Sequence, residues 1–322
     1  MQKRVVVLGG VGFIGSHLCR RLLNEGHEVF CVDIRDVSNA PVLREVKRNP
    51  AFHYIHHNII HPFGIRCDEI YNLTAPSMVR YNKALPVETL KISMQGSIHA
   101  LDTARSERAR VVLASAGSIP SLITRNTPAL HPHCTTRHIV AESKRAAEAL
   151  HHAYNTEFGV DTRIARIYNT YGGGADLMDQ RVVIKMVMAA LQNREIQIEG
   201  SGEQLRTFCY VEDMVDGLVK LMGAPTTDHT RLVSLGGDEE ISILELAERI
   251  RSAVGSKSRI VHLAPRREES RRRIPDLTAA RNELGWRPST SLDEGLKRTI
   301  SYAEAMLKQR SGAIYTWVEL NH

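Results

Sequence analysis

The chain has 322 residues, of which 43% are hydrophobic and 24% are charged, and its formal net charge is +6. This composition is typical of a globular protein with one large domain or two coupled domains, and no hydrophobic run is long enough for a membrane helix. The modest positive charge favours anionic ligands such as nucleotides. With only 5% aromatic residues, the chain does not match a nucleic-acid binder, so we expect neither a nucleic-acid nor a membrane partner.

The five cysteines are scattered along the chain without a CxxC pair. This pattern is typical of reduced thiols in a cytoplasmic protein and argues against a disulfide framework or a zinc site. The 15 histidines also lack the spacing of metal ligands, so we expect no metal. Because the sequence begins directly with a predicted strand, we expect no secretory signal.

The first predicted element is a buried strand at residues 5–8 that runs into a glycine-rich turn and a helix. Gly9, Gly12 and Gly15 follow the strand at a spacing of three. In such a motif the first glycine permits a tight turn, the second lets a pyrophosphate approach the backbone, and the third lets the helix pack on the strand. Asp33 ends the second predicted strand, where a carboxylate can accept hydrogen bonds from an adenosine ribose. The stretch therefore predicts a dinucleotide site.

Strands and helices then alternate through the first half. Further strands are predicted at residues 28–32, 53–56, 68–74, 110–115 and 162–167, and helices at 41–47, 87–106 and 139–157. This alternation predicts an α/β fold of the Rossmann type, with a doubly wound parallel sheet. Right-handed crossovers place the carboxyl ends of the strands on one rim, where ligands bind.

The second half predicts a smaller α/β domain packed on the first. Helices are expected at residues 181–192, 214–222 and 292–308, and short strands at 196–198 and 208–211. Asp213 is expected to cap the helix at 214–222, and Ser242 opens another helix with Glu245 at its third position, as in a capping box. We place the domain boundary between residues 1–175 and 176–322, with some elements interleaved.

Several motifs together resemble the extended short-chain dehydrogenase/reductase family that modifies nucleotide sugars. They lie at residues 9–18, 163–172, 180–183, 200–213, 272–276 and 284–286. The match spans nearly the whole chain and is most similar to the UDP-glucuronate decarboxylase branch. The resemblance implies NAD in the first domain, a nucleotide diphosphate sugar (a UDP-sugar first of all) under the second, and a homodimer that pairs the helices at 87–106 and 139–157. The implied chemistry is oxidation of the sugar at C4, followed by decarboxylation, dehydration or epimerisation.

The resemblance assigns cofactor contacts to positions along the first half. These are Gly9, Gly12, Phe13, Ile14, Gly15, Asp33, Asn58, Ile59, Leu73 and Lys144. Lys144 is expected at the nicotinamide ribose. Asp33 favours NAD over NADP because a carboxylate repels a 2′-phosphate, and Arg35 slightly tempers that preference.

The resemblance also assigns residues to the nucleotide sugar. Asn169 is expected to contact the sugar diphosphate, and Arg181 and Arg206 lie where the family binds the nucleotide and pyrophosphate. Arg272, from a basic cluster at residues 266–273, is expected against the diphosphate, with Tyr210 near the same place. Planar guanidinium groups suit phosphate oxygens.

The sequence departs from the family at three catalytic positions. The family places a Tyr four residues before the Lys, and this chain has Val140 there, which cannot take a proton. Ala116 stands where a Ser or Thr hydroxyl is expected, and Ser118 stands where the decarboxylases have a Glu. The candidates for the missing acid–base groups are Lys144, Ser115, Ser118 and His138, with His133 and Cys134 nearby. The pKa of a His side chain lies near neutrality, which suits acid–base catalysis. On a regular helix, however, the His138 side chain would point in a different direction from that of Val140.

Two hypotheses follow from this departure. In the first, the protein is an NAD-dependent nucleotide-sugar lyase, epimerase or oxidoreductase with altered acid–base residues. In the second, it is an inactive pseudoenzyme that binds NAD and a nucleotide sugar as a sensor or partner subunit.

Overall fold

The computed structural model describes residues 1–75, 85–117, 119, 139–227, 229–265 and 272–319. Of the sequence-based candidates, Ser118, His133, Cys134 and His138 lie outside these residues.

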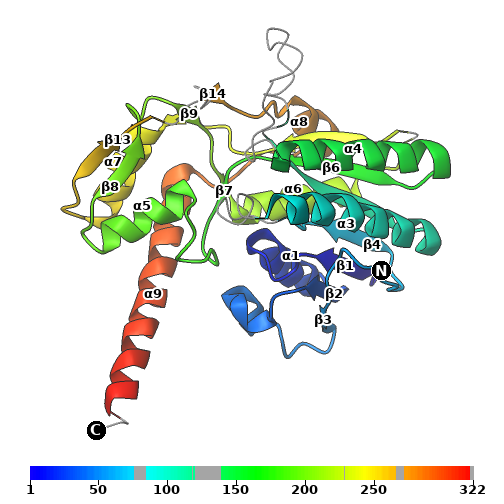
Figure 1. Ribbon diagram of the computed structural model, residues 1–322, viewed down its shortest axis with the longest axis horizontal. Helices are drawn as coiled ribbons and strands as arrows, with labels where there is room; N and C mark the ends of the chain where they lie inside the picture. The colour runs from blue at the N-terminus through cyan, green and yellow to red at the C-terminus, as the bar shows by residue number, and fades with distance from the viewer. Residues whose placement is uncertain (76–84, 118, 120–138, 228, 266–271, 320–322) are drawn as a thin grey trace.

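A seven-stranded parallel sheet forms the centre of the molecule (Figure 1). Its strand order is β11-β6-β5-β4-β1-β2-β3, and every neighbouring pair is parallel. The expected doubly wound sheet is confirmed, and β11 adds an edge strand that the sequence analysis did not predict. The strands are β1 (Arg4–Leu8), β2 (Glu28–Asp33), β3 (Phe52–His56), β4 (Glu69–Asn72), β5 (Arg110–Ala116), β6 (Thr162–Ile167) and β11 (Arg231–Leu235).

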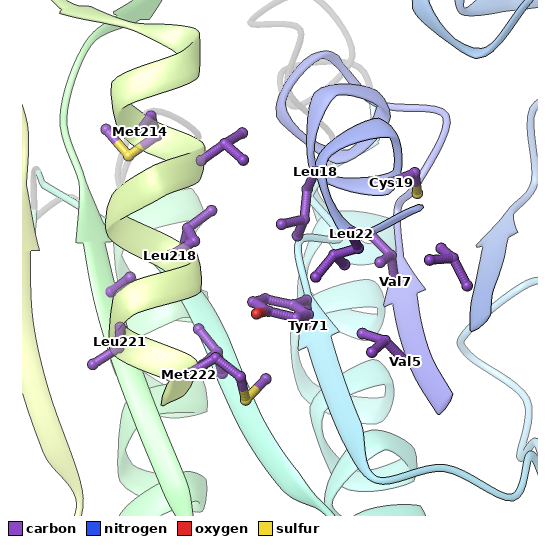
Figure 2. Packing of buried hydrophobic residues seen from close by; sticks show 14 of the residues in the cluster. Val5, Val7, Leu18, Cys19, Leu22, Tyr71, Met214, Leu218, Leu221 and Met222 are labelled. Atoms are coloured by element: carbon purple, nitrogen blue, oxygen red, sulfur yellow. The ribbon is translucent and has the colours of Figure 1, made fainter. Parts of the chain in front are cut away.

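Helices cover both faces of this sheet because the side chains of its central strands are apolar on both sides. In β1, Val5 and Val7 pack with α1 (Phe13–Asn24) and α6 (Val211–Gly223), as Figure 2 shows around Tyr71. Val6 and Leu8 point to the opposite face and pack with α3 (Pro86–Glu107). Next to α3 lies α4 (Ile139–Phe158), which contacts β5 and β6. A strand buried on both faces is what the unbroken β-branched run predicts.

The second half forms a smaller layer with its own apolar core (Figure 1). Its helices α5, α7 and α9 pack around short strand pairs, and α9 extends away from the body with the C-terminus at its far end. Three small sheets have the orders β10-β7, β12-β9-β14 and β13-β8. The remaining elements are η1 (Val37–Asn39), η2 (Pro41–Glu45), β7 (Thr170–Tyr171), α5 (Val182–Leu191), β8 (Ile196–Glu199), β9 (Leu205–Arg206), β10 (Cys209–Tyr210), β12 (Ile241–Ser242), α7 (Ile243–Val254), β13 (Ile260–Leu263), β14 (Arg272–Arg273), α8 (Thr278–Leu284) and α9 (Leu292–Glu319).

The predicted cap at Asp213 is wrong. Helix α6 begins at Val211 with Tyr210 as its N-cap residue, so Asp213 lies inside the first turn. Its carboxylate instead accepts hydrogen bonds from the Ser289 hydroxyl at 2.7 Å and the Thr290 N–H at 2.9 Å. The carboxylate that the sequence predicted to cap the helix is thus hydrogen-bonded to a distant segment of the chain. The predicted cap at Ser242 is confirmed by the bond from the Glu245 N–H, at 3.0 Å.

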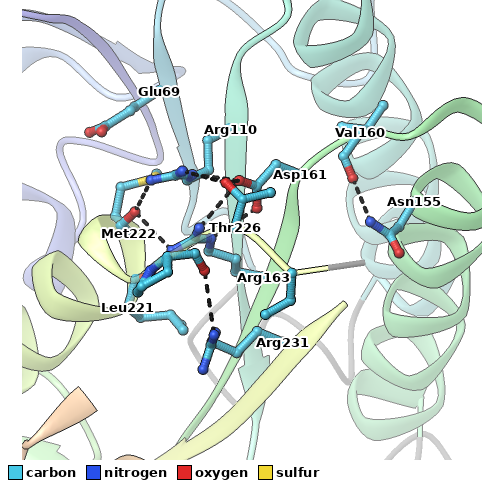
Figure 3. A network of polar contacts seen from close by, with 12 residues as sticks. Glu69, Arg110, Asn155, Val160, Asp161, Arg163, Leu221, Met222, Thr226 and Arg231 are labelled. Carbon is cyan, nitrogen blue, oxygen red and sulfur yellow. Dashed lines mark hydrogen bonds and ion pairs between the residues drawn. The ribbon is translucent and has the colours of Figure 1, made fainter. Parts of the chain in front are cut away.

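The C-terminal end of α6 is held by a buried polar network (Figure 3). Arg163 and Arg110 both donate to the Met222 carbonyl, at 2.9 and 2.7 Å, and Arg163 also donates to the Leu221 carbonyl. Asp161 pairs with both guanidinium groups. Since the last carbonyls of a helix have no intrahelical donor, the two arginines satisfy them and tie α6 to β5 and β6.

No helix in the described part of the chain combines the length and apolar content that a membrane span requires.

Candidate active site

The glycine turn between β1 and α1 has the geometry of a dinucleotide-binding loop. Gly9 has a φ of +78°, which suits glycine, and its N–H bonds the Val32 carbonyl at 2.8 Å. A β-carbon on Gly15 would lie 2.3 Å from the Gly9 carbonyl oxygen, and one on Gly12 would lie 2.8 Å from it. The absent side chains therefore let α1 start directly against the turn. The first N–H groups of a helix have no intrahelical acceptor, so the start of α1 offers donors that suit a pyrophosphate.

Asp33 lies beside this loop, as the sequence predicts. One carboxylate oxygen accepts the Val11 N–H at 3.0 Å, and the other accepts the Arg35 N–H at 3.0 Å. The Arg35 guanidinium lies 3.8 Å from the Asp33 carboxylate and donates to the Val11 carbonyl. Asp33 is thus held in place at the end of β2, next to the loop.

The other cofactor candidates differ in what their side chains do. Leu73 follows β4, and its carbonyl carbon lies 3.1 Å from where a β-carbon on Gly9 would be, so it forms the wall of the loop. Ile59 is buried against Gly96 of α3, and its carbonyl accepts a bond from His99. Its side chain therefore belongs to the core. Asn58 accepts the Ile60 N–H in a local turn, at 3.2 Å.

Lys144 is buried on the face of α4 that looks toward the sheet. Its exposed fraction is 4%, and its ammonium donates to the Thr74 carbonyl, just past the end of β4, at 2.9 Å. Burial lowers the pKa of Lys144 to about 8, while the carboxylate of Glu148 one turn later acts in the opposite direction. The structure thus places the amine at the carboxyl ends of the strands.

The Ser115 hydroxyl is engaged by Glu148, which lies one turn after Lys144 on α4. It donates to Glu148 at 2.6 Å, and Arg166 of β6 holds the same carboxylate with two bonds at 2.9 and 2.7 Å. Glu148 and Arg166 were missed by the sequence analysis. The four-residue spacing from Lys144 to Glu148 indicates that both lie on one helix face. The sequence around Arg166 has no feature that predicts its contact with Glu148.

Val140 and Ala116, which the resemblance aligns with a catalytic Tyr and a catalytic hydroxyl, lie on α4 and β5. Val140 occupies the second position of α4, one turn before Lys144, and is half-buried. Ala116 is the last residue of β5 and is also half-buried. Neither side chain can exchange a proton.

Two substrate candidates share a small cavity next to the start of α1. Asn169 and Arg181 line a cavity of about 100 Å³ together with Phe13 and Phe208. The Arg181 guanidinium lies 5.3 Å from the centre of the Phe13 ring and pairs with Asp179. Phe13 therefore borders both the glycine loop and the predicted sugar-nucleotide side.

The remaining substrate candidates lie on the neighbouring small sheets. Arg206 is buried on β9, and Arg272 lies on the adjacent strand β14, where it is exposed and paired with Glu240. Tyr210 packs on Tyr171, with ring centres 5.7 Å apart, and under the Arg298 guanidinium of α9. Its ring thus lies beside α9 and does not line the cavity with Asn169.

A larger cleft of about 640 Å³ lies elsewhere, between α1, α6 and the start of α9. Its lining charges pair with one another: Arg21 with Asp216, and Arg298 with Glu212 and Glu294. Among the residues that the structure describes, no three His, Cys, Asp or Glu side chains come close enough together to hold a metal ion.

Residues 5–236 match the model of the NAD-dependent epimerase/dehydratase family. This chain belongs to that family. NAD is the family's cofactor, and the glycine loop, the start of α1 and Asp33 fit it. The loop has the positive φ and the tight helix contact that only glycines permit.

Two relatives that are similar to this chain in sequence are UDP-glucuronic acid decarboxylases. Decarboxylase 1 of Danio rerio is 36% identical over 324 residues, which cover 98% of this chain and 76% of the relative. Decarboxylase 5 of Arabidopsis thaliana is 34% identical and covers 91% of this chain and 87% of the relative.

Solved structures confirm the fold. UDP-glucose 4-epimerase from Thermotoga maritima, in complex with UDP-glucose, superposes with a TM-score of 0.81 at 24% identity, over 94% of this chain and 99% of that one. A UDP-glucuronic acid 4-epimerase from Bacillus cereus, in complex with UDP-glucuronic acid and NAD, gives a TM-score of 0.82 at 21% identity, with the same coverage of both chains.

Proposed function

We propose that this protein binds NAD and a UDP-sugar and modifies the sugar in the manner of a UDP-glucuronate decarboxylase. The observation that carries the proposal is that Phe13 borders both the glycine loop and the cavity with Asn169 and Arg181. Phe13 is the first residue of α1, directly behind the glycine loop. A dinucleotide on the loop and a nucleotide sugar in an enlarged form of the cavity would thus be neighbours. The identity to two UDP-glucuronic acid decarboxylases supports this substrate class.

NAD, when bound, would supply a hydride acceptor for C4 of the sugar. The chain's residues position both partners for that transfer. The N–H groups at the start of α1 would bind the pyrophosphate of the dinucleotide, and Asp33 would accept hydrogen bonds from its adenosine ribose. Lys144 donates one hydrogen bond to the Thr74 carbonyl. An amine has more than one N–H group, so Lys144 can also donate to the nicotinamide ribose. Arg181, Arg206 and Arg272 neutralise the sugar diphosphate, beside Asn169.

The proton of the C4 hydroxyl needs an acceptor other than Val140. Among the described candidates, Ser115 already donates to Glu148, whereas Lys144 has a pKa lowered to about 8 by burial. A substantial fraction of its amine is therefore neutral near pH 8 and competent to take a proton. We propose Lys144 as the acceptor.

This proposal is tested by incubating the purified protein with NAD and UDP-glucuronate. We expect NADH absorbance at 340 nm or a product that has lost carbon dioxide, detected by mass spectrometry. The rate should rise with pH through about 8, because the neutral amine is the active form. Lys144→Arg keeps the charge but stays protonated, so it should lose turnover while retaining nucleotide binding. A rate that is flat from pH 6 to pH 9 contradicts the role of Lys144.

A second function is favoured by the hydrocarbon side chains at Val140 and Ala116. In this alternative the protein binds NAD and a UDP-sugar without turnover, as a sensor or partner subunit. Screening UDP-, GDP-, CDP- and dTDP-sugars separates the two functions. Measurable binding of one of them without NADH or product supports the pseudoenzyme, and turnover of any of them rejects it.

We further propose that residues 1–175 bind NAD and that residues 176–322 bind the nucleotide sugar, with α6 and β11 returning to the large sheet. We also propose a homodimer that pairs α3 and α4. Exposed apolar side chains at the start of α3 support it, since Val87 is 63% exposed and Leu90 is 39% exposed. The mass in solution from light scattering tests this, and Leu90→Glu should shift it to the monomer.

The four described cysteines are free thiols, which fits the cytoplasmic location that we propose.

A further inference from the structure

Arg35 lies across the dinucleotide loop, and the proposed function gives its side chain no role. Its backbone N–H bonds the Asp33 carboxylate, and its carbonyl accepts the Tyr54 hydroxyl at 2.9 Å. Both ends of the residue are therefore held. Its side chain reaches back over the turn to the Val11 carbonyl, and one guanidinium nitrogen lies 3.9 Å from where a β-carbon on Gly12 would be.

The guanidinium and the Asp33 carboxylate form one paired unit at the mouth of the ribose site. They are 3.8 Å apart, and the Arg35 side chain is 50% exposed while that of Asp33 is 8% exposed. The carboxylate is thus nearly covered, and the cation forms the outer surface. A group that bonds Asp33 from the solvent side must lie next to the guanidinium.

This arrangement changes what the site does to the 2′ position of an adenosine ribose. A lone carboxylate accepts a hydrogen bond from the 2′-hydroxyl and repels a 2′-phosphate, which favours the unphosphorylated dinucleotide. A guanidinium at the same place offsets the repulsion and supplies planar donors suited to phosphate oxygens. We propose that Arg35 is a specificity-determining residue that lets this chain bind NADP(H) as well as NAD(H), by pairing with the 2′-phosphate.

The experiment compares NADH and NADPH binding to the full chain by fluorescence titration or calorimetry, at low and high salt. In the unmodified protein, NADPH should bind within about thirtyfold of NADH. Arg35→Gln should weaken NADPH by about tenfold or more, the value of one lost charge-assisted contact, and change NADH by less than about threefold. NADPH affinity should also fall more steeply with salt. Because Arg35 is half-exposed, the variant should fold, and its thermal midpoint verifies this.

Arg259→Gln is the matched control, since it removes the same charge from a side chain that is 78% exposed immediately before β13, in the other half of the molecule. It should change neither affinity. The inference rests on the proposed binding of a dinucleotide at the glycine loop, and the outcomes separate the two. If neither cofactor binds, both proposals fail. If NADH binds but NADPH is more than about thirtyfold weaker, or if Arg35→Gln weakens both cofactors equally or neither, only the role of Arg35 is overturned.

Discussion

Gly15 shows at the scale of one residue why the loop demands its particular amino acids. Its α-carbon lies so close to the preceding turn that a β-carbon would be 2.3 Å from the Gly9 carbonyl oxygen and 2.9 Å from the Gly10 α-carbon. Both obstacles are backbone atoms, which have no rotamer to change. Adding one methyl group must therefore push α1 away from β1.

We expect Gly15→Ala to lower the free energy of unfolding by about 2 kcal/mol, the usual cost of overpacking, and to weaken NADH binding more than tenfold. Urea unfolding and NADH titration measure the two effects. Gly64→Ala is the control, because a β-carbon there would meet no atom within 4 Å, and it should stay within about 0.5 kcal/mol. Equal stability of the two variants would show that the loop tolerates a wider helix contact.

Val140 poses a different question at the same scale, namely whether the site lacks only one phenol. It lies four residues before Lys144 on α4, so a Tyr there would share the helix face of the amine. We expect Val140→Tyr to raise the rate of NADH formation with UDP-glucuronate, because a cation beside the phenol lowers its pKa and makes it a better base. The rate at 340 nm is the measurement, and Val140→Phe, which adds the ring without the hydroxyl, should give no increase. If both variants behave alike, the surroundings have also been remodelled.

Among the elements, α6 depends on side chains that reach its end from other strands. Arg163 is 1% exposed and makes its bonds to the Leu221 and Met222 carbonyls and to Asp161 inside the core (Figure 3). Replacing it leaves helix carbonyls and a partly covered carboxylate without their donor.

We expect Arg163→Leu to cost about 3 kcal/mol of unfolding free energy, as when one partner of a buried pair is removed. Urea denaturation followed by circular dichroism gives the value. Arg259→Ala should change stability by less than about 0.5 kcal/mol, since an exposed ion pair contributes little. A loss below about 1 kcal/mol for Arg163→Leu would mean that Arg110 alone suffices to hold α6.

For the whole molecule, His17 ties α1 to the segment that follows β7. It lies on α1, is 6% exposed, and donates from Nε2 to the Gly173 carbonyl at 2.8 Å, while its other ring nitrogen faces the Arg20 guanidinium. Burial lowers its pKa from 6.5 to about 4. The folded state therefore needs the neutral ring, whereas the unfolded chain binds a proton below pH 6.5.

Stability should consequently fall as the pH drops from about 6.5 to about 4, with His17 contributing about 3 kcal/mol to that loss. His151, which is fully buried and has its pKa lowered to about 4 by burial, adds to it in the same direction. Urea midpoints at pH 7, 5 and 4 follow the effect. His17→Gln keeps a donor but cannot titrate, so its stability should decline less over this range. An identical decline in both proteins would place the acid sensitivity elsewhere.

The amino-acid sequence by itself determined the parts of this protein that depend on near neighbours. The β-branched run before Gly9 predicts a buried parallel strand, and the three-residue glycine spacing with Asp33 predicts the dinucleotide loop. Both depend on backbone conformation and burial over a few residues. The family resemblance added the positions of Lys144 and Val140.

Only the tertiary structure decided which partner each polar group takes. Asp213 bonds Ser289 and Thr290 in place of its own helix, Ser115 gives its hydroxyl to Glu148, and Arg35 covers Asp33. The edge strand β11 likewise exists because it pairs with β6, far away in the sequence. A buried polar group must find a hydrogen-bond partner wherever the fold supplies one, so its partner, and with it its role in the site, is settled by packing between distant segments.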